Sequence, residues 1–444
     1  MSDLLSIGAS GIRAYQSAIA TTSDNIANAG NEGYTRRTTE MREVVTTSSL
    51  RSNGGSGVVV TGVSRMGDDA RADAVRSASA DLARTETSAT WLGRIENALN
   101  DNGLSDQLTA FFNSAKSVAA DPSATAPRAI MLESAASLAS AFTATSKALD
   151  GAASDLDASA EAAVSQLNQL AAGLAKVNAG LSRAPANSAG QATLLDQRDG
   201  LLEQMSALTD VTVTLDDFGR ANVLAGGRDG PMLVQGDTHG AVTYLRNEEG
   251  AVSLAVHGKD GTRTMMASGG TLGGAIEGAQ RIANARTELD AIAAAVVDGV
   301  NDVQAQGEGL DGRPGAPIFA AGDPPAELSL VLSDPRGIAA ALPGGGSRDN
   351  GNLANLESLR GTSNVEGRLG DAITANATAL TARRTVADAQ TAIRDTAVAS
   401  RDSLSGVNLD EEAVDLMRFQ QAYQASSRII QVARETLQSI LNIQ

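Results

Sequence analysis

The sequence predicts a mainly α-helical, rod-like protein of several domains that carries a small β insert. Three observations support this prediction. Long stretches in both halves of the chain have apolar residues at helical spacing, whereas the stretch after Thr209 alternates with a period of two. Both chain ends carry an apolar repeat of seven residues, which is typical of paired helices. At 444 residues the chain exceeds what one compact core usually serves, so we expect two to four domains.

The C-terminal helix carries the clearest repeat. Its start is marked by Asn408 and Glu411, which fit a capping box. Large side chains then recur every seven residues, and a second set follows three residues after each. The stripe consists of Leu416, Phe419, Tyr423, Ser426, Ile430, Ala433, Leu437 and Ile440. This helix would be about 50 Å long, and a stripe only two residues in seven wide requires a partner.

The N-terminal segment offers that partner because it carries the same repeat. Its stripe consists of Leu5, Gly8, Ile12, Tyr15, Ile19, Thr22, Ile26 and Ala29. We expect the N- and C-terminal helices to pair as a coiled coil and to serve as an assembly interface. The alternative is that both helices pack on an ordinary core, but core helices usually show a wider apolar face. The predicted interface residues are Leu5, Ile12, Tyr15, Ile19, Ile26, Leu416, Phe419, Tyr423, Ile430, Leu437 and Ile440.

Further amphipathic helices are predicted between the two ends. They cover residues 68–100, 128–181, 191–208, 275–306 and 372–402, with a shorter amphipathic stretch that begins at Leu104. Gly151 is the expected interruption of the helix over 128–181. A short strand is expected over 58–63, and residues 347–367 are predicted to be loop with short helical content.

A small antiparallel β module is predicted in the middle of the chain. Glycine-containing turns separate its strand-like runs, which are 211–215, 221–224, 232–234, 241–245 and 251–256. The Gly- and Pro-rich segment 307–346 is assigned to the same module. The predicted domains are a terminal coiled-coil domain (1–35 and 405–444), a helical middle domain (36–210, 272–309 and 346–404) and a β-rich outer domain (211–271 and 310–345).

Composition excludes several classes of function. The formal charge of −17 and the pI near 4.6 argue against nucleic acid or an anionic membrane as a partner, because both repel an acidic surface. The absence of cysteine excludes disulfides and thiolate metal sites. The chain contains no run of eighteen apolar residues, so no membrane insertion is expected. Its N-terminus has neither a basic nor an apolar region typical of a cleaved signal peptide.

The sequence does not predict an enzyme. The chain has two histidines, His239 and His257, and both lie in the glycine-rich β region without a recognisable catalytic motif. The chain has no cysteine, and no further histidine lies near these two, so neither a metal site nor a cofactor site is expected. We therefore expect no catalytic, metal or cofactor-binding residues, and a structural role.

Several blocks of the sequence resemble a known family. Residues 24–29, followed by 33–36, resemble the motif shared by bacterial flagellar axial proteins; its residues here are Asn25, Asn28, Gly33 and Tyr34. Residues 406–412 and 419–425 resemble the C-terminus of such proteins in its hook-associated form. Four internal blocks, at 194–199, 269–274, 300–312 and 334–340, resemble the FlgK family of flagellar hook-associated proteins. The chain departs from the family's pattern at Gly30-Asn31-Glu32, where Asn-Thr-Pro is usual, and at Gln304, where many relatives have His.

The resemblance implies a structural subunit of the bacterial flagellum, at the junction between hook and filament. It implies self-assembly into a ring of identical subunits, contacts with the flagellar hook protein and a second hook–filament junction protein, and an export chaperone in the cytoplasm. It also implies an extracellular location, reached by the flagellar type III pathway without a cleaved signal peptide. The alternatives are another flagellar axial protein, such as a hook or distal rod subunit, or a junction subunit with an added surface-adhesive role.

Overall fold

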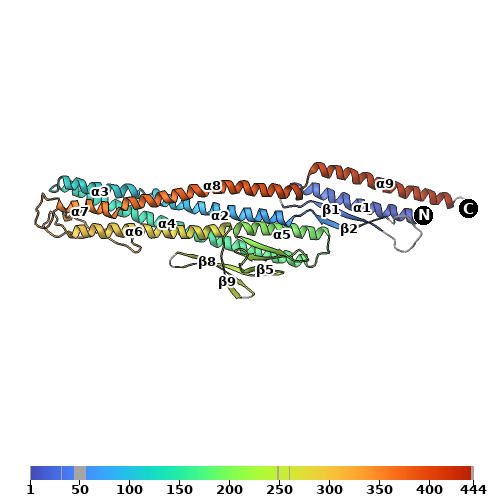
Figure 1. The fold of residues 1–444 in the computed structure, drawn as a ribbon, viewed down its shortest axis with the longest axis horizontal. Helices are drawn as coiled ribbons and strands as arrows, with labels where there is room; N and C mark the ends of the chain where they lie inside the picture. Colours follow the sequence, from blue (N-terminus) through green and yellow to red (C-terminus); the bar gives the residue numbers. More distant parts are fainter. Residues whose placement is uncertain (1, 32, 45–56, 248–249, 260, 442–444) are drawn as a thin grey trace.

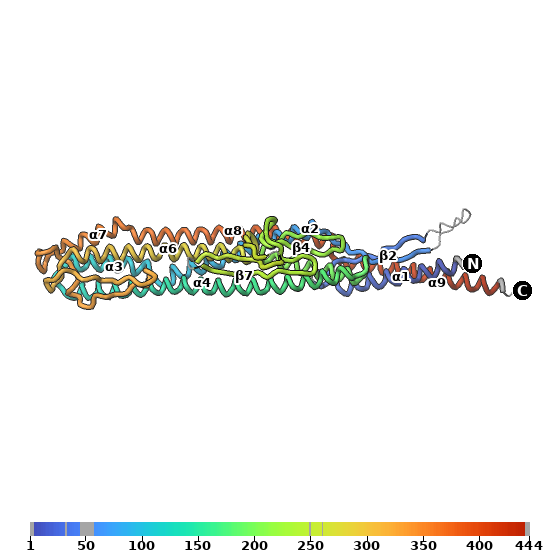
Figure 2. The backbone as a smooth tube through the Cα atoms, turned by 90° about the horizontal axis from the view of Figure 1, so that it is seen from below, coloured from blue at the N-terminus to red at the C-terminus, as the bar shows by residue number. Residues whose placement is uncertain are grey.

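The protein is a long rod in which helices run nearly parallel to the long axis (Figures 1 and 2). The computed structural model describes residues 2–31, 33–44, 57–247, 250–259 and 261–441. Both termini lie at the same end of the rod, and the chain turns back at the opposite end, near α7 (Figure 1). The predicted fold class, mainly α-helical with small antiparallel sheets and paired terminal helices, is confirmed.

Most of the chain is helical. The α-helices are α1 (Ser2–Asn28), α2 (Asp69–Asn100), α3 (Leu104–Ala120), α4 (Thr125–Leu181), α5 (Ala189–Leu208), α6 (Gly270–Ala305), α7 (Gly351–Ser363), α8 (Val365–Ser405) and α9 (Leu409–Leu441). The strands are β1 (Arg37–Glu43), β2 (Val58–Arg65), β3 (Val211–Leu215), β4 (Ala221–Ala225), β5 (Met232–Gln235), β6 (Thr238–His239), β7 (Ala241–Arg246), β8 (Val252–Gly258), β9 (Gly261–Met265), β10 (Phe319–Ala320) and β11 (Ser329–Leu330). A short 3₁₀ helix covers Pro335–Gly337.

The core of the rod lies between α2, α3, α4, α6 and α8. Its aromatic residues gather at the end of the rod opposite the chain termini, where the ring centroids of Phe111 and Phe319 are 5.6 Å apart. Trp91 of α2 packs so closely on α6 that a Cβ at Gly278 would lie 2.5 Å from the indole. Small residues at the helix contacts therefore let long helices approach closely, as the Ala- and Gly-rich composition favours.

Two antiparallel sheets lie along one side of the rod (Figure 1). Strands β3–β4–β5–β6 form one sheet, and β7–β8–β9 form the other. Their buried side chains share a second core cluster with α4 and α5. Asp157 of α4 anchors the second sheet, because it accepts hydrogen bonds from the Tyr244 hydroxyl and from Nε of Arg246 at 2.7 Å.

The structure differs from the sequence prediction in three places. Helix α4 continues through Gly151, because this position is exposed, and one such glycine costs about 1 kcal/mol of helix propensity without breaking the helix. Residues 351–363, predicted to be mostly loop, form α7. Strands β1 and β9 were not predicted, because their alternating positions are largely polar.

A fourth difference concerns the segment 310–345, which was grouped with the β module. Its buried side chains, among them Ile318, Phe319 and Leu332, belong to the core of the rod, whereas those of β3–β9 belong to the separate cluster on α4 and α5. Glycine and proline content correctly indicated a non-helical segment, but composition does not reveal which core such a segment joins.

A buried arginine ties this segment to the rod. Arg128 of α4 is 1% exposed, and its Nε and Nη2 donate to the Pro122 carbonyl oxygen at 3.0 and 2.8 Å. Its Nη1 donates to the Ile338 carbonyl oxygen. Burial lowers the pKa of this guanidinium. Arg128 therefore joins the α3–α4 connection to the segment 310–345 through backbone carbonyls.

Replacing Arg128 with Met should lower the free energy of unfolding by about 3 kcal/mol, because two buried carbonyl groups lose charged donors. Urea denaturation followed by circular dichroism measures the change. Arg313→Met is the control: this exposed arginine lies in the same segment, and its loss should change the free energy by less than about 0.5 kcal/mol. Equal stability of the two variants would contradict the role given to Arg128.

Candidate assembly interface

The terminal helices α1 and α9 lie side by side and run antiparallel (Figure 1). Their closest approach is at two glycines of α1. A Cβ at Gly8 would lie 2.6 Å from Cγ1 of Ile430, and a Cβ at Gly11 would lie 2.7 Å from Oγ of Ser426. The distance at Gly8 is shorter than a Cβ tolerates, so this position needs glycine while the helices keep this spacing, whereas at Gly11 the Ser426 hydroxyl could turn away.

The predicted stripe of α9 faces α1. Ser426 and Ala433 are buried, and four larger members are half-buried: Leu416, Phe419, Tyr423 and Ile430. Leu437, near the end of the helix, is 41% exposed, and the side chain of Ile440 lies outside the described residues. The pairing of the two helices is thus confirmed, whereas the role of each residue in assembly stays a prediction.

The face that α1 buries differs from its predicted stripe. The large predicted residues are only half-buried: Leu5, Ile12, Tyr15, Ile19 and Ile26. The buried positions carry small or polar residues: Gly8, Gly11, Ala14, Ala18, Thr21, Thr22 and Asn25. The reason is that α1 packs on two sides. It contacts α9 on one side and the β1–β2 hairpin on the other, where Thr39 donates to Oγ1 of Thr21 at 2.9 Å.

Asn25 joins three segments of this terminal domain. Its Nδ2 donates to the Arg37 carbonyl oxygen at 2.8 Å and to Oε2 of Glu412 at 2.9 Å. Its Oδ1 accepts from the Arg37 backbone N–H at 3.0 Å and from the Tyr34 hydroxyl at 2.9 Å. The residue is 1% exposed. Asn25 therefore uses both ends of its amide to hold α1, the start of β1 and the first turn of α9 together.

Glu412 is a buried carboxylate that is fully paired. It is 2% exposed, and its Oε1 accepts from Nε of Arg36 at 2.6 Å while Oε2 accepts from Asn25. Its position in the first turn of α9 also suits a negative charge. Arg36 in turn donates from its backbone N–H to the Ser405 carbonyl oxygen at 2.8 Å. The pair thus fixes the point where α8 gives way to α9.

The four motif residues divide into two groups. Tyr34 belongs with Asn25, and burial raises the pKa of its phenol, which keeps the hydroxyl a donor at neutral pH. Asn28 and Gly33 shape the turn instead. Asn28 donates to the Asp24 carbonyl oxygen at 2.8 Å, and Gly33 has φ of +79°, a conformation that favours glycine.

The hairpin is held on the rod by an ionic ladder that the sequence analysis did not predict. Nη2 of Arg37 contacts Oδ2 of Asp196 at 2.9 Å, and Nε of Arg65 contacts Oδ1 of the same carboxylate at 2.6 Å. Nη2 of Arg65 also contacts Asp199 at 2.5 Å. Both acids belong to the block 194–199 of α5. That block was noted as a family resemblance, but its spacing alone did not reveal arginines more than a hundred residues away.

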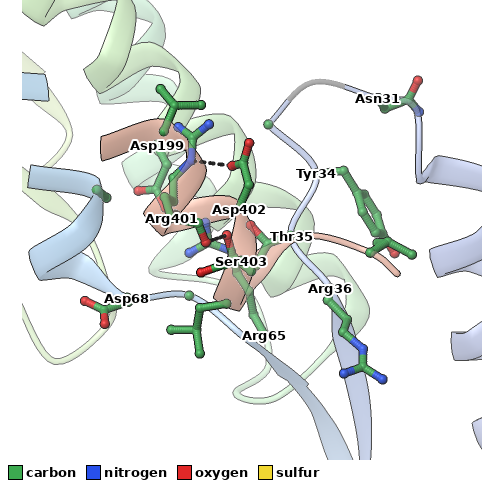
Figure 3. A pocket seen from close by; sticks show the side chains of 18 of the residues that line it. Asn31, Tyr34, Thr35, Arg36, Arg65, Asp68, Asp199, Arg401, Asp402 and Ser403 are labelled. Carbon is green, nitrogen blue, oxygen red and sulfur yellow. Dashed lines mark hydrogen bonds and ion pairs between the residues drawn. The ribbon is translucent and has the colours of Figure 1, made fainter. Parts of the chain in front are cut away.

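A cleft of about 610 Å³ lies where the terminal domain meets the rod. Figure 3 shows Asn31 and Tyr34 on one side of the cleft and Asp199, Arg401 and Asp402 on the other. The cleft therefore separates the loop after α1 from the middle of α5 and the end of α8.

The outer face of α9 carries exposed apolar side chains among polar ones, such as Gln421 and Arg428. Val414, Met417 and Val432 are 60%, 55% and 59% exposed. Val414 and Val432 are eighteen residues apart, which is five helical turns, so they lie on one face. Among the described residues, α1 covers the opposite face of α9 and leaves these three apolar side chains exposed.

No helix among the described residues combines the length and hydropathy needed to cross a membrane. In the same ranges, no three His, Asp or Glu side chains come together in a way that could hold a metal ion.

Comparison with known proteins decides the family. The model of the flagellar hook-associated protein FlgK helical domain matches residues 92–319, just over half of the chain. The chain belongs to the FlgK family. A second model, the C-terminal region of the flagellar basal body rod FlgEFG proteins, matches residues 400–443 of this FlgK-family chain.

Individual relatives agree with the family. Flagellar hook-associated protein 1 of Salmonella typhimurium is 29% identical over 343 residues, which cover 73% of this chain and 60% of the relative. The chain thus spans less than two thirds of that relative's length. The Bacillus subtilis protein of the same name is 25% identical over 497 residues. The match covers 97% of this chain and 96% of the relative.

One solved structure supports the fold. The flagellar hook junction protein FlgK from Burkholderia pseudomallei matches 56% of this FlgK-family chain and 47% of its own, with a TM-score of 0.51 and 22% identity.

Asn25→Ala should lower the free energy of unfolding of the terminal domain by about 2 to 3 kcal/mol, because it leaves the buried Glu412 without one of its two partners. Hydrogen exchange of the first turns of α9 should accelerate. Asn28→Ala is the matched control. It replaces the same residue type in the same helix, but it removes only local hydrogen bonds, to Asp24 and Asn31. Equal exchange in both variants would contradict the Asn25 arrangement.

Gly8→Ala should separate α1 from α9 near Ile430, because the added methyl has no room there. The expected result is faster hydrogen exchange in α1, even though alanine has the higher helix propensity. Gly30→Ala serves as the control, because a Cβ at Gly30 meets nothing within 4 Å. Slower exchange in Gly8→Ala would refute the close contact.

Proposed function

We propose that this chain is a structural subunit of the bacterial flagellum that forms part of the hook–filament junction and assembles through its terminal helices. The observation that carries the proposal is the set of exposed apolar side chains on α9. One face of the helix is covered by α1, and the opposite face presents Val414, Met417 and Val432 to solvent between polar residues. Exposed apolar side chains on a long helix favour contact with another subunit.

The names of the relatives support this role. The Salmonella and Bacillus relatives are flagellar hook-associated proteins, and the Burkholderia structure is of a flagellar hook junction protein. The proposed partners are further copies of this chain in a ring, the flagellar hook protein, a second junction protein and a cytoplasmic export chaperone. The proposed location is outside the cell at the hook–filament junction, after export by the flagellar type III pathway. The proposed role is structural rather than enzymatic.

The proposal keeps the predicted terminal domain over 1–35 and 405–444, and it places the segment 310–345 with the rod instead of with the β module. The hydrogen bonds of Asn25 and the Arg36–Glu412 ion pair support this grouping, because they join both ends of the chain. In this proposal the predicted interface residues, Leu5 to Ile26 on α1 and Leu416 to Ile440 on α9, hold the helix pair together and border the face that meets a neighbouring subunit.

A hook or distal rod subunit is the second candidate. The match of residues 400–443 to the C-terminal region of rod proteins favours a shared axial role, and it does not distinguish the two candidates. The match of residues 92–319 to the FlgK helical domain favours the junction.

A strain that lacks this protein tests the junction role. We expect it to assemble hooks without attached filaments and to lose swimming, both scored by electron microscopy and motility in soft agar. Normal filaments in the deletion strain would contradict the junction role, and loss of hooks as well would favour the hook or rod subunit.

Complementation with Val414→Asp/Val432→Asp tests the assembly face. The variant should fold and yet fail to restore filament attachment, because two charges in the exposed stripe cannot be buried against a neighbour without a large desolvation cost. Leu245→Asp on β7 is the matched control, since Leu245 is 61% exposed and lies on the side sheet. Full motility with the double variant would refute the assembly role of this face.

A further inference from the structure

Strand β3 has a free edge. It is the outermost strand of its sheet and pairs only with β4 among the described residues. The Gly226 N–H donates to the Asp210 carbonyl oxygen at 2.9 Å. At the other end, the Asp216 N–H donates to the Arg220 carbonyl oxygen at 3.1 Å. Hydrogen-bonded and non-hydrogen-bonded pairs alternate along an antiparallel ladder, so the even-numbered residues of β3 bond to β4. The odd-numbered residues therefore point their N–H and C=O groups away from β4. They are Val211, Val213 and Leu215.

Elsewhere the chain covers such backbone groups with asparagine side chains. On the edge strand β7, Nδ2 of Asn168 donates to the Val242 carbonyl oxygen at 3.0 Å, and its Oδ1 accepts from the Val242 N–H at 2.7 Å. Asn301 of α6 bonds to the Phe319 backbone at β10 in the same way, at 2.8 and 3.2 Å. In the part of the chain that the structure describes, no such side chain reaches the odd-numbered residues of β3. Their backbone groups are left for water or for another strand.

The sequence of β3 favours pairing with a further strand. Its five residues, Val-Thr-Val-Thr-Leu, are mostly β-branched and include neither a charge nor a proline. Its register with β4 has no bulge. Natural proteins usually block a free edge with lysine, proline or a bulge, because the edge otherwise pairs with another chain. β3 carries none of these devices, so its edge stays competent to add a strand.

A groove of about 590 Å³ runs along this free edge. Its volume lies within the range of ligand sites in proteins, about 300 to 1,000 Å³. Residues of β3 line one side of the groove, residues of α2 line another, and α5 contributes Leu202 and Ser206. The groove therefore offers space for a short peptide beside the unpaired backbone groups of β3.

Strand β3 and helix α2 border the groove along its length. At one end, a Cβ at Gly269 would lie 3.1 Å from Cβ of Asp210 and 3.3 Å from Cβ of Ala80, so the start of β3 is close to Ala80. At the other end, Arg198 donates to the Gly219 carbonyl oxygen just after β3 and contacts the first residue of α2 at 3.7 Å. β3 thus runs antiparallel to α2. The groove follows a strand of five residues, about 17 Å long.

The α2 side of the groove is acidic. Asp69, Asp73 and Asp81 line it, and their spacings of four and eight residues place them on one face of the helix, about 6 and 12 Å apart. Side chains on one face of an extended strand recur about every 6.6 Å, which matches this spacing. Asp81 is exposed and forms no ion pair within the described ranges. Five aspartates and three arginines line the whole groove, so its net charge is −2. An extended segment with basic side chains complements this charge.

We propose that the free edge of β3 binds an extended basic segment of a partner protein, which adds to the four-stranded sheet beside β3. The backbone of the segment bonds to the outward N–H and C=O groups of Val211, Val213 and Leu215. Lysine or arginine side chains on one face of the segment reach Asp69 and Asp81. Backbone hydrogen bonds supply affinity in this mode of recognition, and the side chains supply specificity. The site lies apart from the outer face of α9, and the inference does not depend on how the chain assembles.

Fluorescence anisotropy with the purified full-length chain tests the site. The basic probe is a labelled peptide of about seven residues that alternates lysine with valine and threonine, the usual length of a short strand. The control probe keeps the lysines but has proline in place of valine and threonine. Because the chain carries a net charge of −17, unspecific attraction acts equally on both probes. At about 150 mM salt the basic probe should bind at least about tenfold more tightly, because proline cannot donate to a strand ladder. A third probe with glutamate in place of lysine should bind at least about tenfold more weakly than the basic probe.

Variants of the chain locate the binding. Val213→Pro removes an outward N–H without removing a bond to β4, so it should abolish binding of the basic probe. Asp69→Asn/Asp81→Asn should weaken binding about threefold or more, as expected for two partly exposed ion pairs. Glu86→Gln/Glu96→Gln is the matched control, since it removes two charges from α2 outside the groove and should leave the affinity unchanged.

Hydrogen exchange at single residues keeps the test decisive if Val213→Pro does not fold. In the free chain the Val213 N–H should exchange quickly and the Thr212 N–H slowly, and the basic probe should slow Val213 selectively. Equal binding of the basic and proline probes, equal binding of the glutamate probe, or unchanged exchange at Val213 would overturn the proposal. Protection of Val213 that rises with protein concentration alone would also overturn it, because a second copy of the chain would then occupy the edge.

Discussion

The close contact between α1 and α9 is the constraint on which the rest of the structure depends. It requires glycine at position 8, and it brings Asn25 beside Glu412 at the other end of the pair. With both groups buried, neither the amide nor the carboxylate could remain without its partners. The contact therefore fixes the register of the pair, and with it the place where both chain ends meet the rod.

The hairpin and the rod follow from that register. Asn25 also holds the first residue of β1, so the hairpin leaves the helix pair at one defined point, and its base presents Arg37 and Arg65 to α5. The same register turns Val414 and Val432 away from α1. A helix pair that is closed on its inner face and carries exposed apolar side chains on its outer face suits the proposed role, because it combines a defined fold with a surface for another subunit.

Sequence reasoning predicted the parts of the fold that depend on one element at a time. The seven-residue repeat of α9 predicted its partner and the face that it buries. The repeat of α1 predicted the pairing with α9, but it did not predict the most buried positions. Because α1 packs between α9 and a polar hairpin, small residues such as Ala14 and Ala18 fill the narrow contact while the isoleucines lie at its edges. The useful signal was the run of small residues three or four apart.

The missed contacts depend on tertiary placement. Asp196 and Asp199 are one turn apart on α5, which predicts a shared face but not the arginines that meet it. Arg128 gave no signal at all, because its acceptors are backbone carbonyls of distant segments. The segment 310–345 was recognised as irregular, but its place in the core follows from Phe319 and Ile318 packing on α3 and α6, which no local pattern encodes.

Cryo-electron microscopy of isolated flagella tests the central claim most directly. The account predicts this chain at the boundary between hook and filament, with α1 and α9 still paired through Gly8 and Ile430 and with Val414, Met417 and Val432 packed against a neighbouring subunit. A map in which α9 leaves α1, or in which that outer stripe faces open solvent, would contradict it.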